Sequence, residues 1–164
     1  MAKPLWAPWR LEYIEHADEE DGCVFCREAA GQIPDSESLV LARGQASFAL
    51  LNKFPYSSGH LMVAPLRHEG TLGSLSDGEA LELHRLSVEA LAALGRVYVP
   101  DGFNLGWNLG RAAGAGITDH VHLHVVPRWS GDTNFMPVLS DVKVLPEHLL
   151  ATRDRLRESW GVSE

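Results

Sequence analysis

The chain has 164 residues, of which 45% are hydrophobic, and it carries a formal net charge of −8. This length is enough for one domain that buries a core without cross-links. The negative charge argues against binding that is driven by the field of nucleic acid or of an anionic membrane. It is compatible with a local basic pocket for a phosphorylated small molecule.

No apolar run approaches the length of a membrane span, and residues 1–10 lack the uninterrupted apolar stretch of a signal peptide. We therefore expect a cytoplasmic protein that binds neither membranes nor nucleic acid. The two cysteines, Cys23 and Cys26, are too few for a disulfide framework. Their spacing is typical of half a metal site or of a redox pair.

The first part of the chain predicts an irregular arm followed by strands. Residues 4–9 contain two tryptophans and two prolines, which disfavour a helix and suit an aromatic arm lying across a neighbouring surface. Residues 27–30 predict one helical turn that ends at Gly31. Strand-like patterns then predict an antiparallel meander over residues 39–42, 46–52 and 60–65.

The second part predicts two helices and further strands. Ser76 and Glu79 form a capping-box signature, and helical spacing of apolar residues continues from about residue 77 to about residue 97. Residues 103–108 predict a strand, and a last helix is expected from about residue 146 to residue 158. The predicted fold class is α+β, an antiparallel sheet with a long helix on one face and a short C-terminal helix.

A histidine-rich strand is predicted over residues 118–129. Its alternation puts His120, His122 and His124 on one face and the aliphatic residues between them on the other. Three of the eight histidines then converge on one surface, which suits metal, phosphate or proton chemistry. The alternative interpretations are a half-buried strand whose outer face is merely polar and a chance histidine-rich tract.

The cysteine pair can supply two thiolates to a tetrahedral zinc ion, which imidazoles from elsewhere could complete. The candidates are His68 and His120. Four protein ligands with no open position would make the zinc structural, so its loss is expected to loosen the fold more than the chemistry. A reduced buried cysteine pair and a redox motif stay open as alternatives.

The loop over residues 108–116, rich in glycine and alanine, leads directly to the histidines. Its small residues let backbone amides approach phosphate oxygens closely. A phosphate loop beside an unprotonated imidazole favours nucleophilic attack on phosphorus through a covalent intermediate. His122 is central in the row and best placed to attack, while His60 is expected to lie across the site and orient the row.

These features resemble the histidine triad (HIT) superfamily of nucleotidyl transferases and hydrolases. The resemblance implies a single HIT domain over residues 1–164, with a core of about 23–129, an N-terminal aromatic arm over 1–22 and a C-terminal extension over 130–164. It rests on the motif His120-Val121-His122-Leu123-His124-Val125-Val126, on Asn52 eight residues before His60, on Gly59-His60, and on Asn108-x-Gly110.

The family resemblance also implies roles for individual residues. The protein would be a homodimer in which His122 becomes nucleotidylated on the α-phosphorus, while His124 contacts the attacked phosphate or the leaving group. His60, expected across the site from its place in the sequence, is the third catalytic candidate. The expected nucleotide- and phosphate-binding residues are Asn52, Asn108, Gly114, Ala115, Gly116, Ile117, His124 and Trp129. Zinc-containing members carry ligands at the positions of Cys23, Cys26, His68 and His120, so structural zinc is the expected cofactor.

Five further segments resemble a bacterial subgroup of diadenosine tetraphosphate phosphorylases, in which inorganic phosphate accepts the adenylyl group to give ATP and ADP. An adenosine polyphosphate is therefore the expected substrate, with phosphate or water as acceptor. A hydrolase of dinucleoside polyphosphates or of adenylated amines and a non-catalytic nucleotide-binding protein remain alternatives. The matching segments are Trp6-Ala7-Pro8-Trp9-Arg10, Gly22-Cys23-Val24-Phe25-Cys26, Ser58-Gly59-His60-Leu61-Met62-Val63, Asp101-Gly102-Phe103-Asn104 and Val126-Pro127-Arg128-Trp129.

Overall fold

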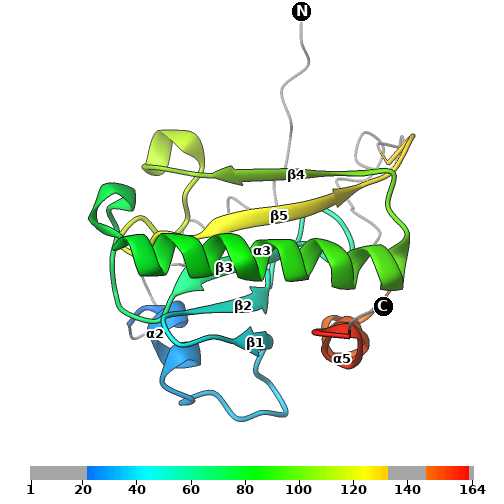
Figure 1. Ribbon diagram of the computed structural model, residues 1–164, viewed down its shortest axis with the longest axis horizontal. Coiled ribbons are helices and arrows are strands. Elements are labelled where there is room, and N and C mark those ends of the chain that lie inside the picture. The colour runs from blue at the N-terminus through cyan, green and yellow to red at the C-terminus, as the bar shows by residue number, and fades with distance from the viewer. Residues whose placement is uncertain (1–21, 133–146, 163–164) are drawn as a thin grey trace, which may run out of the picture.

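The computed structural model describes residues 22–132 and 147–162, so residues 1–21 of the expected aromatic arm lie outside the described part (Figure 1). The described residues form an antiparallel five-stranded sheet of order β1-β2-β3-β5-β4 with helices around it. The strands are β1 Val40–Arg43, β2 Ser47–Leu51, β3 Leu61–Pro65, β4 Gly102–Trp107 and β5 Leu123–Arg128. The α-helices are α2 Val24–Ala29, α3 Asp77–Tyr98 and α5 Leu149–Ser159, and short 3-10 turns cover Leu72–Ser74 and Arg111–Ala113.

The sheet brings distant parts of the sequence side by side. The predicted meander is confirmed, with β2 paired to both β1 and β3. On its other side β3 pairs with β5, so that Met62 lies opposite His124. Gly106 of β4 faces His124 from the opposite side. His124 therefore stands on the sheet between an apolar side chain and a glycine.

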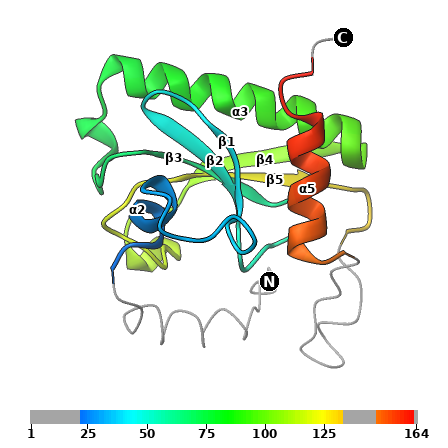
Figure 2. The same cartoon turned by 90° about the horizontal axis from the view of Figure 1, so that it is seen from below.

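Side-chain alternation gives the sheet two different faces. One face packs against α3 and α5, and the other packs against α2, which lies on the opposite side of the sheet from α3 (Figure 2). On the α3 face the core includes Ala49, Leu51, Leu61, Val63 and Val125. On the α2 face it includes Phe25, Phe48, Leu50, Met62 and Ala64.

Helix α3 begins where the sequence predicts. The Ser76 hydroxyl accepts from the Glu79 backbone N–H, and the Glu79 carboxylate accepts from the Ser76 backbone N–H at 2.8 Å. This capping box satisfies two backbone groups at the end of the helix that would otherwise lack partners. None of the described helices is both long and apolar enough to cross a bilayer.

Strand β5 is shorter than predicted, because it begins at Leu123 and leaves His120 and His122 before the strand. The reason lies in the partner strand, which ends at Pro65. Proline has no backbone N–H to continue the ladder beyond the Val63–Leu123 pair. The helix predicted from residue 146 likewise begins later, at Leu149, with His148 as its N-cap.

Val99 ends α3 in the left-handed conformation, with a φ of 46°. That conformation costs an L-residue about 1–2 kcal/mol, and the side chain, 76% exposed, gains little from packing. Val99→Gly is therefore expected to raise the free energy of unfolding by about 1 kcal/mol. Denaturant unfolding measures the change. The control Val88→Gly, exposed within the same helix, should lower stability by a similar amount, and destabilisation by both variants would contradict the prediction.

Candidate functional site

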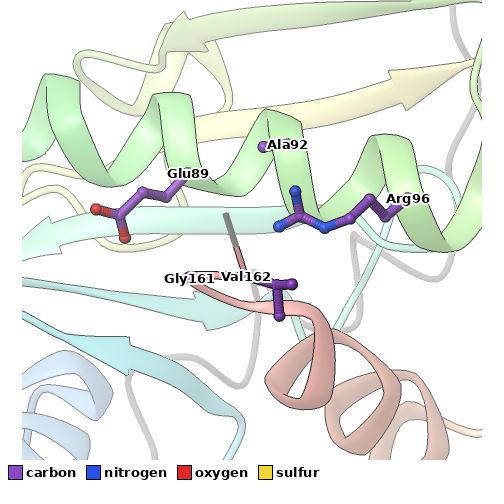
Figure 3. Close-up of a pocket in the computed structure, with 5 residues that line it drawn as sticks. All are labelled: Glu89, Ala92, Arg96, Gly161 and Val162. Carbon is purple, nitrogen blue, oxygen red and sulfur yellow. The ribbon is translucent and has the colours of Figure 1, made fainter. Parts of the chain in front are cut away.

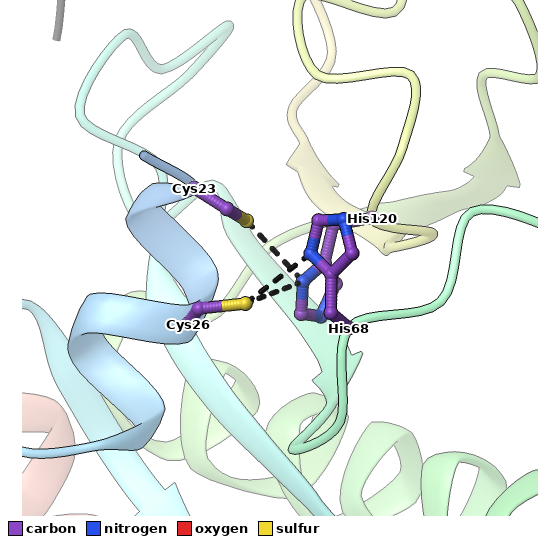
Figure 4. Close-up of side chains that lie close together, drawn as sticks. All are labelled: Cys23, Cys26, His68 and His120. Atoms are coloured by element: carbon purple, nitrogen blue, oxygen red, sulfur yellow. Dashed lines mark hydrogen bonds between the residues drawn. The ribbon is translucent and has the colours of Figure 1, made fainter. Parts of the chain in front are cut away.

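The four predicted metal ligands converge in the structure (Figure 4). Their ligand atoms all lie within 4.8 Å of one another. The Sγ–Nδ1 separations are 3.3 Å for Cys23 and His120, 3.2 Å for Cys26 and His68, and 3.6 Å for Cys26 and His120. Around a tetrahedral ion with ordinary metal–sulfur and metal–nitrogen bonds, a sulfur and a nitrogen lie about 3.6 Å apart. The cluster therefore has the spacing and donor set of a metal centre.

Both histidines of the cluster are oriented by a second contact. His120 Nε2 lies 2.9 Å from the Pro65 carbonyl oxygen, and His68 Nε2 lies 3.5 Å from Asp119 Oδ2. Because the Pro65 carbonyl only accepts, it favours a proton on Nε2 of His120 and leaves its Nδ1 lone pair toward the thiols, while the Asp119 carboxylate is an exposed ion-pair contact of His68. Burial lowers the pKa of His120 and raises the pKa of the Cys23 thiol to about 11. A metal ion would thus meet a neutral imidazole and displace a proton from the thiol.

Helix α2, which carries the cysteines, is fixed to β1 by a buried carboxylate. Glu28 accepts from the Ser38 hydroxyl at 2.6 Å and from the Leu39 backbone N–H at 3.0 Å. The Arg43 guanidinium donates to the Ala29 carbonyl at 2.9 Å and also to the Glu28 carbonyl. Charge-assisted bonds of this kind hold a helix too short to be stable alone.

The segment that carries His68 is fixed to α3. Arg67 donates through Nε to Glu79 at 2.6 Å and through Nη1 to Glu69 at 2.8 Å. The hydrogen bonds from Arg67 lower the pKa of Glu79 to about 2. The Glu69 carbonyl in turn accepts from the backbone N–H of Val121 at 2.6 Å. The capping box of α3 and the histidine segment are therefore connected through one network.

A second group of imidazoles lies beside the cluster. His60 Nδ1 accepts from the Tyr56 backbone N–H at 2.9 Å, and His60 Nε2 lies 3.0 Å from His124 Nδ1. Because a backbone N–H only donates, His60 carries its proton on Nε2 and donates it to His124. Neutral His124 then carries its own proton on Nε2, where it can serve as a donor to a substrate oxygen.

His122 has the opposite tautomer. Its Nδ1 lies 2.8 Å from the His120 carbonyl oxygen, which can only accept, so the proton is on Nδ1 and the lone pair is on Nε2. Its ring meets the ring of His124 edge-on, with centroids 4.9 Å apart. The pair thus combines a nucleophilic nitrogen with a neighbouring N–H donor.

Two predicted nucleotide-binding side chains meet this group. The Nδ2 atom of Asn108 lies 3.3 Å from His124 Nε2, and that of Asn52 lies 3.5 Å from His60 Nε2. Asn52 Oδ1 accepts from the Phe54 backbone N–H at 2.9 Å, which fixes the orientation of the amide. Because an amide Nδ2 and a protonated Nε2 are both donors, these are close contacts that place the asparagines beside the histidines without a hydrogen bond between them.

The glycine loop turns sharply between β4 and the histidine segment. Gly110 and Gly114 have φ values of 84° and 85°, which L side chains rarely adopt. Ala115 is buried, Gly116 is half-buried, and Ile117 packs against the apolar cluster on the α2 face of the sheet. The loop thus ends on the same side of the sheet as the histidines.

Trp129 lies away from the histidines in the structure, at the end of α3. It follows the end of β5, and its indole N–H donates to the Tyr98 carbonyl at 3.4 Å, at the end of α3. Alternation along the strand directs it to the face opposite His124. We therefore leave Trp129 out of the candidate site.

The sequence analysis did not identify two aromatic residues that lie at the site. The Phe25 ring lies 4.7 Å from the ring of His122, and the Tyr56 ring stacks on His60 at 4.7 Å. Phe25 stands between the two cysteines, and Tyr56 lies four residues before His60. Their closeness in sequence to candidate residues is the signal that could have identified them.

A hollow of about 300 Å³ lies elsewhere, between α3 and the residues after α5 (Figure 3). Its lining includes Glu89 and Arg96 of α3 and Val162. It is on the α3 side of the sheet, whereas the histidines are on the other side, so it is separate from the candidate site.

The HIT domain family model matches residues 34–131. The chain belongs to the HIT family. The AP-4-A phosphorylase of Mycobacterium tuberculosis is 40% identical to this HIT protein over 163 residues, covering 96% of this chain and 84% of the relative. An adenosine 5'-monophosphoramidase of Schizosaccharomyces pombe is 34% identical over 65% of this chain and 74% of its own length. The crystal structure of a Zn-bound histidine triad family protein from Mycobacterium smegmatis shares the fold, with a TM-score of 0.67, 24% identity and coverage of 84% of this chain and 92% of that one.

The depressed pKa of Glu79 makes stability depend on pH. The ionised Glu79 carboxylate makes its full contribution to the free energy of unfolding above the usual carboxyl pKa of 4.5. This contribution is lost as the pH falls toward 2. Wild type is therefore expected to exceed Glu79→Gln in stability by a constant amount above pH 4.5, with the difference shrinking toward pH 2. Urea unfolding over this range measures it. Glu158→Gln, on the exposed side of α5, is the control, and a difference that does not change with pH would refute the assignment.

Proposed function

We propose that this HIT protein transfers the adenylyl group of diadenosine tetraphosphate to inorganic phosphate, giving ATP and ADP, through adenylyl-His122. The observation that supports it most is the 2.8 Å contact between His122 Nδ1 and the His120 carbonyl, since a carbonyl only accepts and the lone pair is then left on Nε2. The 40% identity to an AP-4-A phosphorylase supports the choice of substrate.

In the proposed first step, His122 Nε2 attacks the α-phosphorus of the substrate. The bond from this phosphorus to the bridging oxygen breaks, and its electron pair leaves on ATP. The His120 carbonyl stabilises the positive charge that develops on the imidazole through Nδ1–H, and His124 Nε2–H donates to an oxygen that gains negative charge. The His60 contact keeps His124 in the tautomer that this donation requires.

In the proposed second step, an oxygen of inorganic phosphate attacks the same phosphorus. The phosphorus–nitrogen bond breaks, its electron pair returns to His122 Nε2, and ADP is released. In this proposal Asn52 holds the ribose, while Asn108 and the backbone of residues 114–117 hold the phosphates. The two φ-positive glycines give that backbone the turn it needs to approach an anion.

We further propose that Cys23, Cys26, His68 and His120 hold a structural zinc ion. Two thiolates and two imidazoles are a common zinc donor set, and zinc bound there would join α2 to the segments around His68 and His120. The site would contribute to folding and to the position of His120, and no step of the reaction uses the ion.

A homodimer is part of the same proposal. Strand β4 is the last strand in the sheet order of the described residues, and its Leu105 is 45% exposed. A strand edge of this kind can pair with a second copy and extend the sheet.

Diadenosine tetraphosphate cleavage with and without phosphate tests the proposal. We expect ATP and ADP in equal amounts with phosphate, no AMP without it, and a loss of rate by several orders of magnitude in His122→Ala. Product analysis by chromatography measures both. His84→Ala, exposed on α3, is the control. Phosphate-independent release of AMP would count against a phosphorylase.

Hydrolysis of adenylated amines is the second candidate, favoured by the similarity to the Schizosaccharomyces pombe phosphoramidase. The same His122 attack would serve it, with an amine as leaving group and water as acceptor. Faster turnover of adenosine 5'-phosphoramidate than of diadenosine tetraphosphate in the same assay would favour this activity.

Zinc binding has its own test. Protein purified without chelators is expected to contain about one zinc ion per chain, and Cys26→Ser should lower both the zinc content and the melting temperature, because binding energy at such a site is folding energy. Elemental analysis and thermal unfolding measure these quantities. A wild-type protein free of zinc, or a Cys26→Ser protein with unchanged zinc content and stability, would argue against the site.

A further inference from the structure

Phe25 lies where the candidate metal centre meets the proposed nucleophile. Its side chain is 1% exposed. The ring centroid is 4.9 Å from that of His120 and 4.7 Å from that of His122, with interplanar angles of 35° and 32°. One ring therefore packs on a candidate metal ligand and on the residue proposed to attack phosphorus.

The position of this ring is fixed by its surroundings. Cys23 and Cys26 flank Phe25 in sequence, so a metal ion bound by the two thiols would hold the backbone on both sides of it. Phe25 itself belongs to α2, so its backbone moves only with that helix. Phe48 of β2 meets the ring only edge-on and at a larger separation, with centroids 6.5 Å apart at 71°.

The proposed chemistry requires one of two orientations of the His122 ring. The torsion that turns an imidazole is broad and roughly two-fold, and a half-turn would place a ring carbon against the His120 carbonyl instead of Nδ1. That turn would lose the hydrogen bond that keeps the lone pair on Nε2. A closely packed aromatic neighbour restricts such a turn, because interiors leave little space for a ring to sweep through.

We propose that Phe25 is a positioning residue that holds the His122 imidazole with Nδ1 on the His120 carbonyl. The consequence for catalysis rests on the proposed function.

The experiment compares Phe25→Leu with Phe48→Leu, which removes the other ring of the same cluster without touching a histidine in the contacts described. We expect Phe25→Leu to keep its zinc, to lower kcat about 10- to 100-fold and to leave KM unchanged, because the nucleophile is misplaced while binding is intact. Phe48→Leu should keep wild-type kcat even if it is less stable. A rise in KM alone would assign the ring to nucleotide binding and overturn the proposal.

Long-range ¹H–¹⁵N spectra of the imidazoles provide a readout that needs no substrate. We expect His122 to be a single Nδ1–H tautomer in wild type and Phe48→Leu, and a mixture in Phe25→Leu. An Nε2–H tautomer in wild type, or a single tautomer in Phe25→Leu, would overturn the proposal even if the enzyme cleaves its substrate. Failure of the proposed function appears separately, as absence of cleavage by wild type.

If Phe25→Leu does not fold, Phe25→Met takes its place, because methionine adapts to the space left by a larger apolar side chain. For Phe25→Met we then expect the zinc content, kinetics and tautomer mixture that were described for Phe25→Leu. The results that would overturn the proposal are also the same. Unfolding of both Phe25 variants while Phe48→Leu folds would assign the ring to stability and overturn the proposal.

Discussion

The end of β3 at Pro65 determines where His120, His122 and His124 lie relative to the sheet. Beyond the Val63–Leu123 pair the ladder cannot continue through a residue that lacks a backbone N–H, so residues 120–122 leave the sheet. The Pro65 carbonyl instead accepts the ring proton of His120. An interruption of pairing thus turns His120 toward the cysteines, leaves His122 before the strand and keeps His124 within β5.

His120 links the two sites because it takes part in both. Its side chain belongs to the cluster with the cysteines, and its backbone carbonyl fixes the tautomer of His122. A movement of His120 would therefore change a metal ligand and the proposed nucleophile together. Two networks hold the segments around His120 in place: the buried Glu28 of α2 bonds to the segment before β1, and Arg67 beside His68 bonds to Glu79.

The three histidines differ in chemistry because their partners differ. The backbone N–H of Tyr56 fixes His60, which fixes His124 as an Nε2–H donor, whereas a carbonyl fixes His122 in the other tautomer. One donor and one lone pair then stand side by side on rings 4.9 Å apart. The sheet supplies the rigid support. The backbone N–H of Tyr56 and the backbone carbonyl of His120, which lie outside the strands, determine the tautomers.

The sequence determined the elements and the candidate ligands, since these follow from local rules. Alternation located the meander, the capping box located the start of α3, and spacing within short motifs selected Cys23, Cys26 and the histidine row. Glycine at positions 110 and 114 marked a turn that only glycine makes easily.

Only the tertiary structure decided which of these residues meet. Pairing of β3 with β5 over a long sequence separation brought His60 to His124, and it also shortened the histidine strand. The packing of Phe25 on His122 and the turning of Trp129 to the far face depend on that arrangement. The physical reason is that a sequence pattern fixes the face on which a side chain lies, whereas its neighbours depend on strand register and on the ends of partner strands.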